Sequence, residues 1–148
     1  MQDVNHQLFC ENVLDEVLLS MRKYDEQKAE EILGRLNLLE QKENHPMSLS
    51  GGQKQRVAVA GAIASERDIL VFDEPTSGLD LKHMKQVSSL IETLKTGGKT
   101  IFIISHDIEF IMKTCDYILH LDSGSVKHCG AFDKNYLLSF FNKMEALA

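Results

Sequence analysis

Hydrophobic side chains recur every three to four residues over much of the chain, which is the spacing of one face of an α-helix. Between residues 13 and 21 the apolar positions are Val13, Leu14, Val17, Leu18 and Met21. The same reading along the chain predicts six helices. They cover residues 13–21, 25–39, about 53–64, 83–95, about 108–114 and 133–147.

Two short segments are apolar without interruption, as is typical of strands in a buried parallel sheet. They are ILVF at 69–72, expected to be buried on both faces, and TIFIIS at 100–105. Two more short strands around a glycine-containing turn are predicted within 117–129. Alternating strands and helices predict an α/β domain with a parallel sheet. The all-helical region 1–48 is expected to be a separate subdomain, followed by a core at 49–148.

Composition and charge restrict the classes of function. The 148 residues are 43% hydrophobic and 26% charged, as in ordinary globular domains, and carry a formal net charge of −6. That charge disfavours a general nucleic-acid coat protein, and no nucleic-acid partner is expected. The longest apolar or glycine run, VAVAGAIA at 57–64, is far below the ~18 residues of a membrane span. Three widely spaced cysteines predict reduced thiols in the cytoplasm.

The stretch LSGGQ at 49–53 combines a helix start with two glycines. Ser50 and Gln53 have the spacing of a capping box, and a well-capped helix is the simplest interpretation. That interpretation leaves Gly51 and Gly52 unexplained, because a first helical turn does not need glycine. An anion site does explain them, since helix N-termini present free N–H groups and glycine lets a phosphate approach the backbone.

Carboxylates and a histidine follow the two predicted strands. Asp73 and Glu74 end the first strand, at the edge where open α/β sheets bind ligands. Asp73 is a candidate Mg²⁺ ligand and Glu74 a candidate base that orients and deprotonates a water. A solvated acidic loop is the alternative. His106 follows the second strand and shares that edge if the strands are parallel.

Together these residues resemble the nucleotide-binding domain of ABC-type ATPases. The resemblance rests on five motifs in the family's order and covers essentially the whole chain. They are a Q-loop-like MQDVNHQLF at 1–9, the signature LSGGQ at 49–53, the Walker B strand ILVFDE at 69–74, the D-loop SGLD at 77–80, and SHD at 105–107 with the switch histidine. Within the family, the chain most resembles the energy-coupling-factor branch and its cobalt- and vitamin-importer relatives. This finer resemblance rests on the segments QDVNHQLF and VLDEV and on AVAGAIA after the signature.

The resemblance implies a P-loop NTPase-like sheet flanked by helices, ATP and Mg²⁺ as cofactors, and an ATP site at a head-to-tail dimer interface. The implied nucleotide and metal contacts are Gln2, Ser50, Gly51, Gly52, Gln53, Asp73 and Asp80, with Glu74 as general base and His106 on the γ-phosphate. Gln2 also senses metal, and Asp80 communicates across the dimer. The implied partners are a second nucleotide-binding domain and a transmembrane permease. The resemblance further implies a location in the cytoplasm, peripheral on the inner face of the cell membrane, with residues 2–21 in the docking surface.

The family also requires a Walker A loop, G-x-x-x-x-G-K-S/T. The one Gly-Lys pair is in TGGKT at 96–100, where Thr93 occupies the required first glycine position. That segment is predicted to run from a helix into a strand, the reverse of a P-loop, so Gly97 and Gly98 are expected to end the helix. The sequence is therefore expected to be the later part of such a domain, and the chain alone is expected to be inactive.

Three other interpretations stay open. A chromosome-maintenance or DNA-repair ATPase of the same superfamily would carry a long coiled coil between the Q-loop and the signature, yet Ser50 follows Gln2 by only 48 positions. A soluble ABC-type translation factor, built from two tandem domains, is a second alternative. A non-catalytic fragment that only binds a partner is the third.

Overall fold

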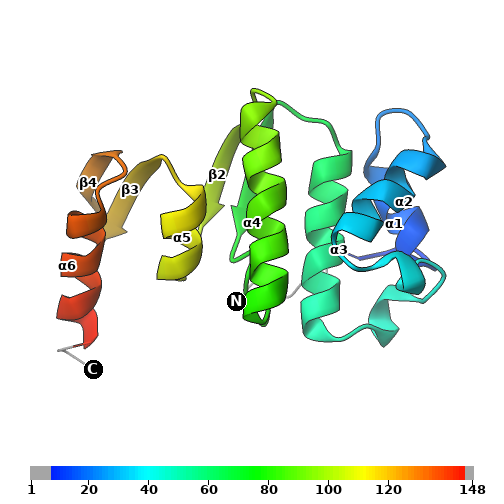
Figure 1. Ribbon diagram of the computed structural model, residues 1–148, viewed down its shortest axis with the longest axis horizontal. Helices are drawn as coiled ribbons and strands as arrows, with labels where there is room; N and C mark the ends of the chain where they lie inside the picture. The colour runs from blue at the N-terminus through cyan, green and yellow to red at the C-terminus, as the bar shows by residue number, and fades with distance from the viewer. Residues whose placement is uncertain (1–7, 146–148) are drawn as a thin grey trace. The chain divides into compact units, whose positions relative to one another are not determined.

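The computed structural model describes residues 8–145, in two compact units that divide after Ser105. Figure 1 shows the order of the elements: helices alone come first along the chain, and strands together with helices follow. The first unit contains α1 (Val13–Ser20), α2 (Glu26–Arg35), two 3-10 turns (Leu39–Gln41 and Pro46–Ser48), α3 (Gly51–Ala64), β1 (Ile69–Asp73), α4 (Leu81–Thr96) and β2 (Thr100–Ile104). The second contains α5 (Ile108–Thr114), β3 (Tyr117–Asp122), β4 (Ser125–Ala131) and α6 (Lys134–Glu145).

Local sequence explains where the helices begin. A short polar side chain precedes each of the first five helices and accepts a hydrogen bond from a backbone N–H of the first turn, which satisfies one otherwise unpaired donor. These caps are Asn12, Asp25, Ser50, Asp80 and Asp107. The predicted helices are all present, with ends shifted by a few residues.

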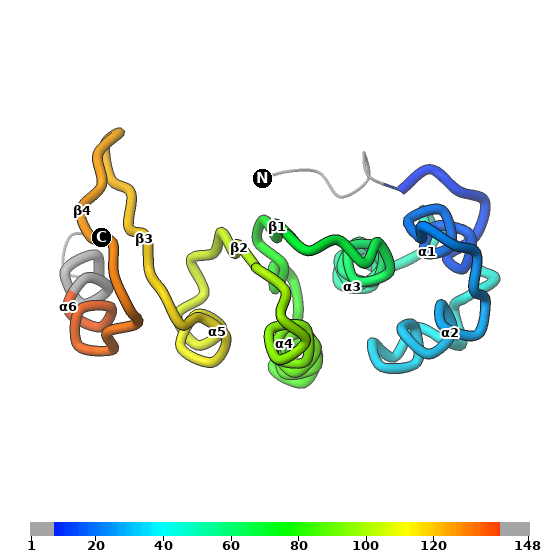
Figure 2. The backbone as a smooth tube through the Cα atoms, turned by 90° about the horizontal axis from the view of Figure 1, so that it is seen from above, coloured from blue at the N-terminus to red at the C-terminus, as the bar shows by residue number. Residues whose placement is uncertain are grey.

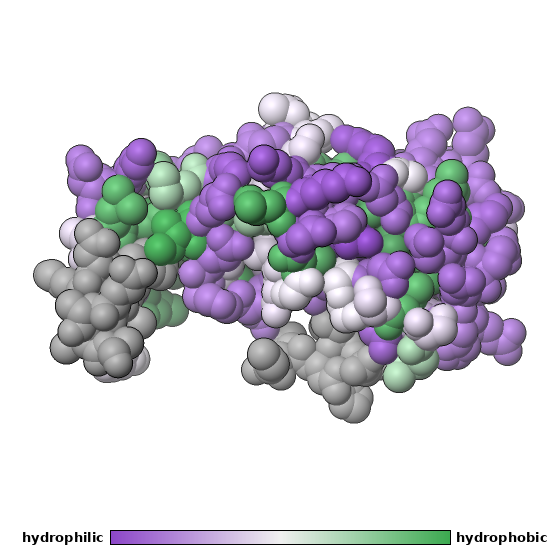
Figure 3. Space-filling view, turned by 60° about the horizontal axis from the view of Figure 1, so that its bottom comes forward, coloured by the Kyte–Doolittle hydropathy of each residue, from purple (hydrophilic) through white to green (hydrophobic). Residues whose placement is uncertain are grey.

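The helical core of the first unit lies between α1, α2 and α3, which pack against one another. Its fully buried side chains are Val13, Val17, Ala29, Leu33, Leu36, Leu38, Val57, Ala60 and Ala64. Elements on both sides of the predicted boundary at residue 48 therefore share a core, and that boundary stays a prediction. Figure 3 shows a mostly hydrophilic surface over this helical region, as expected where apolar side chains point inward.

Strands β1 and β2 pair in parallel, in a register that joins Ile69 to Thr100 and Asp73 to Ile104. The predicted parallel pair is confirmed, and both strands end at the same edge. Helix α4 packs on one face of the pair, as Figure 2 shows. Leu70 and Phe72 are buried, so phenylalanine before the aspartate fits the interior.

The prediction that residues 69–72 are buried on both faces is wrong for the part of the chain that the structure describes. Ile69 and Val71 are 61% and 62% exposed, and Phe102 and Ile104 on the neighbouring strand are 56% and 57% exposed. Successive residues of a strand point to opposite faces, and α4 covers only one of them. The other face of the strand pair therefore carries largely exposed apolar side chains.

The second unit is a two-stranded antiparallel sheet with two helices. Strands β3 and β4 pair through a turn at Gly124, whose φ is 72°, in the left-handed region that glycine adopts freely. Helix α6 lies against this sheet, where the Tyr136 hydroxyl is 2.6 Å from Nδ1 of His120 and its ring stacks on His128. These contacts fix the terminal helix on the hairpin.

Candidate functional site

The signature stretch forms the start of α3. Ser50 is the N-cap: its Oγ accepts from the Gln53 N–H at 3.3 Å, while Gln53 Oε1 accepts from the Ser50 N–H at 2.9 Å. The predicted capping box is confirmed. Ser50 and Gly51 are exposed, and the Ser50 hydroxyl keeps its own proton as a donor. The helix start therefore presents N–H groups and a hydroxyl to an approaching anion.

The two glycines have different surroundings. A Cβ on Gly51 would meet no heavy atom within 4 Å, so this residue leaves open space at the helix start. A Cβ on Gly52 would lie 3.0 Å from the carbonyl oxygen of Gly78 and 3.3 Å from the Leu79 side chain. Gly52 thus allows the helix to approach the following loop. The expectation that both glycines make room for an anion fits Gly51, whereas Gly52 has this packing reason.

This difference predicts opposite effects on stability. Gly52→Ala should lower the free energy of unfolding by about 1–3 kcal/mol, because its methyl group presses on a backbone carbonyl. Gly51→Ala should leave it unchanged or raise it by up to about 1 kcal/mol, since alanine favours helix. Urea denaturation of the two variants beside the unsubstituted chain measures both effects. Equal destabilisation by the two substitutions would contradict the packing described.

The loop after β1 places the carboxylates. Asp73 is exposed at the strand end, and Glu74 is half-buried with a φ of 48°. A left-handed conformation costs a residue with a side chain on the order of 1–2 kcal/mol. Backbone hydrogen bonds hold it here: the Glu74 N–H donates to the carbonyl of Ile104 at 2.8 Å, and its carbonyl accepts from the Ser77 N–H at 3.1 Å. The carboxylates are therefore fixed at the shared edge of β1 and β2.

Asp80 ends this loop and caps α4. Its carboxylate accepts from the His83 N–H at 2.9 Å and lies 2.8 Å from His83 Nδ1. The backbone N–H of His83, chiefly, holds the pKa of Asp80 below its ordinary value. The side chain is nevertheless 66% exposed, so it keeps a face that a partner can contact.

Helix α3 also contributes two buried polar residues that the sequence reasoning missed. Gln55 donates from Nε2 to the Glu74 carbonyl at 3.0 Å. Burial lowers the pKa of the Arg56 guanidinium, and the charge of Asp80 opposes that shift. Gln55 lies four positions before Val59, and Arg56 lies four positions before Ala60. Val59 and Ala60 are both buried. That helical spacing was the available signal, because residues four apart share a face.

The structure thus brings together the signature, the strand-end carboxylates and the D-loop within one unit. His106 lies in the second unit, two residues beyond the end of β2. Gln2 lies outside the described residues. The segment TGGKT does run from a helix into a strand: Gly97 is the C-cap of α4, and Gly98 has a φ of 81°. These glycines end the helix, as predicted.

Asp73 fits a magnesium ion by chemistry, since hard carboxylate oxygen is the donor that Mg²⁺ prefers. Between residues 8 and 145 no group of three or more histidine, cysteine, aspartate or glutamate side chains could hold a metal. Magnesium in nucleotide sites is held by one or two carboxylates together with substrate phosphates. A single exposed Asp73 is compatible with that kind of site.

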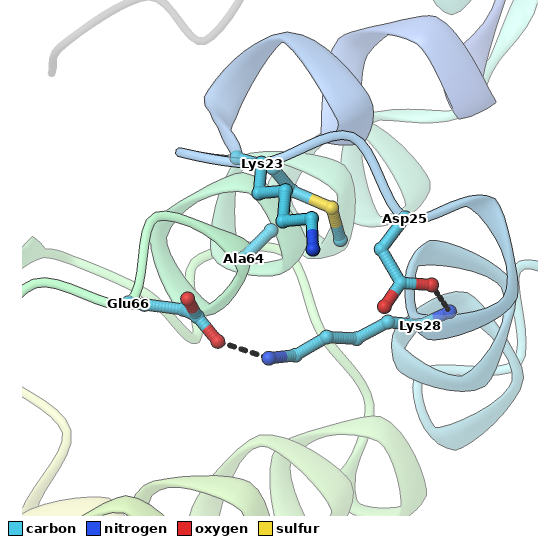
Figure 4. Close-up of a pocket in the computed structure, with 6 residues that line it drawn as sticks. Lys23, Asp25, Lys28, Ala64 and Glu66 are labelled. Carbon is cyan, nitrogen blue, oxygen red and sulfur yellow. Dashed lines mark hydrogen bonds and ion pairs between the residues drawn. The ribbon is translucent and has the colours of Figure 1, made fainter.

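A pocket elsewhere in the first unit is separate from these residues (Figure 4). Its volume is about 170 Å³, and it is lined by Met21, Lys23, Asp25, Lys28, Ala64 and Glu66. The pocket lies at the C-terminal end of α3, whereas the signature lies at the start of this helix. The 14 residues of α3 rise ~1.5 Å each, so the two are about 20 Å apart. Lys28 forms an ion pair with Glu66, so this pocket has little net charge for a phosphate.

Comparison with known families and proteins is consistent with the site. A family model described as ABC transporter matches residues 1–77. A Treponema denticola protein named as an ABC transporter ATP-binding protein is 48% identical, over 85% of this chain and 26% of its own length. The arginine transport ATP-binding protein ArtM of Bacillus subtilis is 37% identical over 84% of this chain and 53% of its own. The energy-coupling factor transporter ATP-binding protein EcfA2 of Mycoplasma genitalium is 40% identical, over 82% and 42%.

Solved structures agree. The dimeric ABC transporter cassette MJ0796 has a TM-score of 0.76 at 31% identity, over 90% of this chain and 61% of that chain. A post-hydrolysis dimer of the same cassette, bound to ADP and phosphate, has a TM-score of 0.77 at 28% identity. The chain spans about a quarter to a half of the length of the curated relatives above.

Proposed function

This chain belongs to the ABC transporter family, and from that premise we propose that it is the signature-bearing part of an ATPase subunit that drives a membrane importer. The observation that carries the proposal is the exposed start of α3, which is open at Gly51. The same helix is bonded through the Gln55 amide to the backbone carbonyl of Glu74, in the loop after β1. Ser50 and Gly51 bind the γ-phosphate of an ATP held by a second nucleotide-binding domain. Their exposure suits a ligand that comes from another chain.

The other residues act on the nucleotide in this chain's own half of the dimer. Asp73 holds Mg²⁺, which supplies positive charge to the phosphates when bound. Glu74 accepts the proton of the attacking water as general base. His106 contacts the γ-phosphate, Gln2 senses nucleotide and metal, and Asp80, exposed at the start of α4, contacts the partner domain.

Gln53 supports this arrangement by fixing the Ser50 backbone in the capping box.

The helices between residues 8 and 48 are α1, of eight residues, and α2, of ten. Neither is the long coiled coil of a chromosome-maintenance ATPase, which favours the importer. None of the helices between residues 8 and 145 has the length and apolar character of a membrane span. The proposal assigns the transport path to a permease subunit.

The docking surface for that permease needs exposed apolar side chains. Residues 2–21 are expected to contribute to this surface, yet the apolar face of α1 is packed inside the unit, and Leu8 and Leu18 are buried. Phe9 and Leu19 are 77% and 69% exposed. Large apolar side chains that a folded unit leaves exposed are candidates for an interface. We therefore place the docking surface around Phe9 and Leu19.

Crosslinking in native membranes tests this function. A photo-crosslinker at Phe9 or Leu19 should capture a protein with membrane-spanning helices, identified by mass spectrometry, because these side chains meet the permease. The control position is Val126 on β4, which is 58% exposed but not in the proposed surface. Capture of a membrane protein from Val126 alone, or of nucleic acid only, would contradict the importer.

A further inference from the structure

The amide of Gln55 links the signature helix to the backbone of the candidate base. Gln55 is 8% exposed, and its Nε2 donates to the carbonyl of Glu74 at 3.0 Å. The contact joins residues 19 positions apart, from α3 to the loop after β1. It is thus a tertiary hydrogen bond, unlike the local bonds of the capping box at the same end of the helix.

This bond acts on a strained residue. Glu74 has a φ of 48°, which a residue with a side chain adopts only where its surroundings hold it. Its N–H is held by Ile104 and its carbonyl by both Ser77 and Gln55. A carbonyl oxygen has two lone pairs, and here both have a donor. Loss of the Gln55 donor therefore releases one of the restraints on the backbone that aims the Glu74 carboxylate.

We propose that Gln55 is a positioning residue that fixes Glu74 relative to the signature helix. The proposal rests on the proposed function, in which Glu74 is the general base. A helix moves as a rigid body over the five residues, or about one and a half turns, from Ser50 to Gln55, so a displacement of Ser50 and Gly51 carries the Gln55 amide with it. Engagement of a nucleotide by the signature is thereby transmitted to the base of this chain's own site.

The test replaces the donor while keeping the size of the side chain. Gln55→Met and Gln55→Glu both lack an amide donor, and they differ in charge. In an assembly that carries these residues and hydrolyses Mg-ATP, each should lower kcat about 10- to 100-fold, the scale of a small misplacement of a reacting group. KM for Mg-ATP should change less than about twofold, because the Gln55 amide is buried and bonded to the Glu74 carbonyl instead of facing solvent.

Ser88→Ala is the matched control. Ser88 is 7% exposed, and its hydroxyl donates to Met84 of its own helix, so the variant loses a buried hydrogen bond without touching Glu74. It should keep the wild-type kcat. Thermal unfolding of all variants separates loss of fold from loss of positioning.

A second measurement needs no activity. Amide hydrogen exchange in the chain should become faster at Glu74 and Ser77 in Gln55→Met and stay unchanged there in Ser88→Ala. Wild-type kcat in both Gln55 variants, where Glu74→Gln abolishes turnover, would overturn the positioning role. Failure of every assembly that carries these residues to hydrolyse Mg-ATP would instead overturn the proposed function, and exchange at Glu74 would still decide whether Gln55 restrains this loop.

Discussion

Replacement of Glu74 by glutamine is expected to lower steady-state ATP hydrolysis by about 10²–10⁴-fold, the usual contribution of a general base. Glutamine has the same shape but accepts no proton at neutral pH. The backbone bonds from Glu74 to Ile104 and Ser77 do not involve the carboxylate, so the turn should persist. Nucleotide binding should therefore remain while the chemical step is lost. Phosphate release and equilibrium binding of Mg-ATP, measured in the complete domain, separate the two effects.

Glu92→Gln is the control for the removal of one carboxylate. Glu92 lies on α4, where it pairs with Lys95 at 2.9 Å, and its side chain is 44% exposed. That substitution should leave turnover unchanged, because an exposed ion pair of this kind contributes little. Turnover of Glu74→Gln at the level of Glu92→Gln would show that Glu74 is only a solvated carboxylate at the end of a strand.

The sequence predicted the order of the elements and the parallel pairing because both follow from local signals. Short apolar runs mark β1 and β2, helical periodicity marks α4, and Ser50 with Gln53 marks the start of α3. Motif order then identified the family correctly, and the fold class was confirmed by the cassette structures. These features depend on residues close together in the chain.

Features that depend on what packs against an element could not be read in the same way. An unbroken apolar run does not say how many faces are covered, and β1 exposes Ile69 and Val71. The apolar stripe of α1 was consistent with a docking face, yet Leu18 is packed inside the unit. The tight approach of Gly52 to Gly78 joins two segments 26 residues apart. Such contacts come from tertiary structure, which periodicity does not encode.

The polypeptide of residues 1–148 by itself is expected to bind Mg-ATP weakly and to show no sustained hydrolysis. ABC-type sites rely on a P-loop whose backbone N–H groups and lysine cradle the β- and γ-phosphates. The nearest candidate in this sequence is TGGKT at 96–100. Neither the backbone nor the lysine of this segment has the arrangement of a P-loop.

The backbone of this segment closes α4: the Gly98 N–H donates to Lys95, and the Lys99 N–H donates to Leu94. A phosphate cradle needs such N–H groups to be free. The Lys99 ammonium is also engaged, since it donates to the Glu66 carbonyl at 2.9 Å and lies 3.2 Å from the Asp68 carboxylate. Neither the backbone nor the lysine is therefore arranged for phosphate.

Calorimetric titration with Mg-ATP and a phosphate-release assay on residues 1–148 measure this prediction directly. Lys99→Met is the matched variant, because the lysine of a true P-loop contacts the transferred phosphate and its loss would abolish turnover. In any assembly that contains these residues and hydrolyses ATP, Lys99→Met should leave turnover unchanged. The substitution should remove only the contacts of Lys99 to Glu66 and Asp68. Micromolar affinity and sustained turnover by residues 1–148, abolished by Lys99→Met, would show that this segment binds phosphate after all.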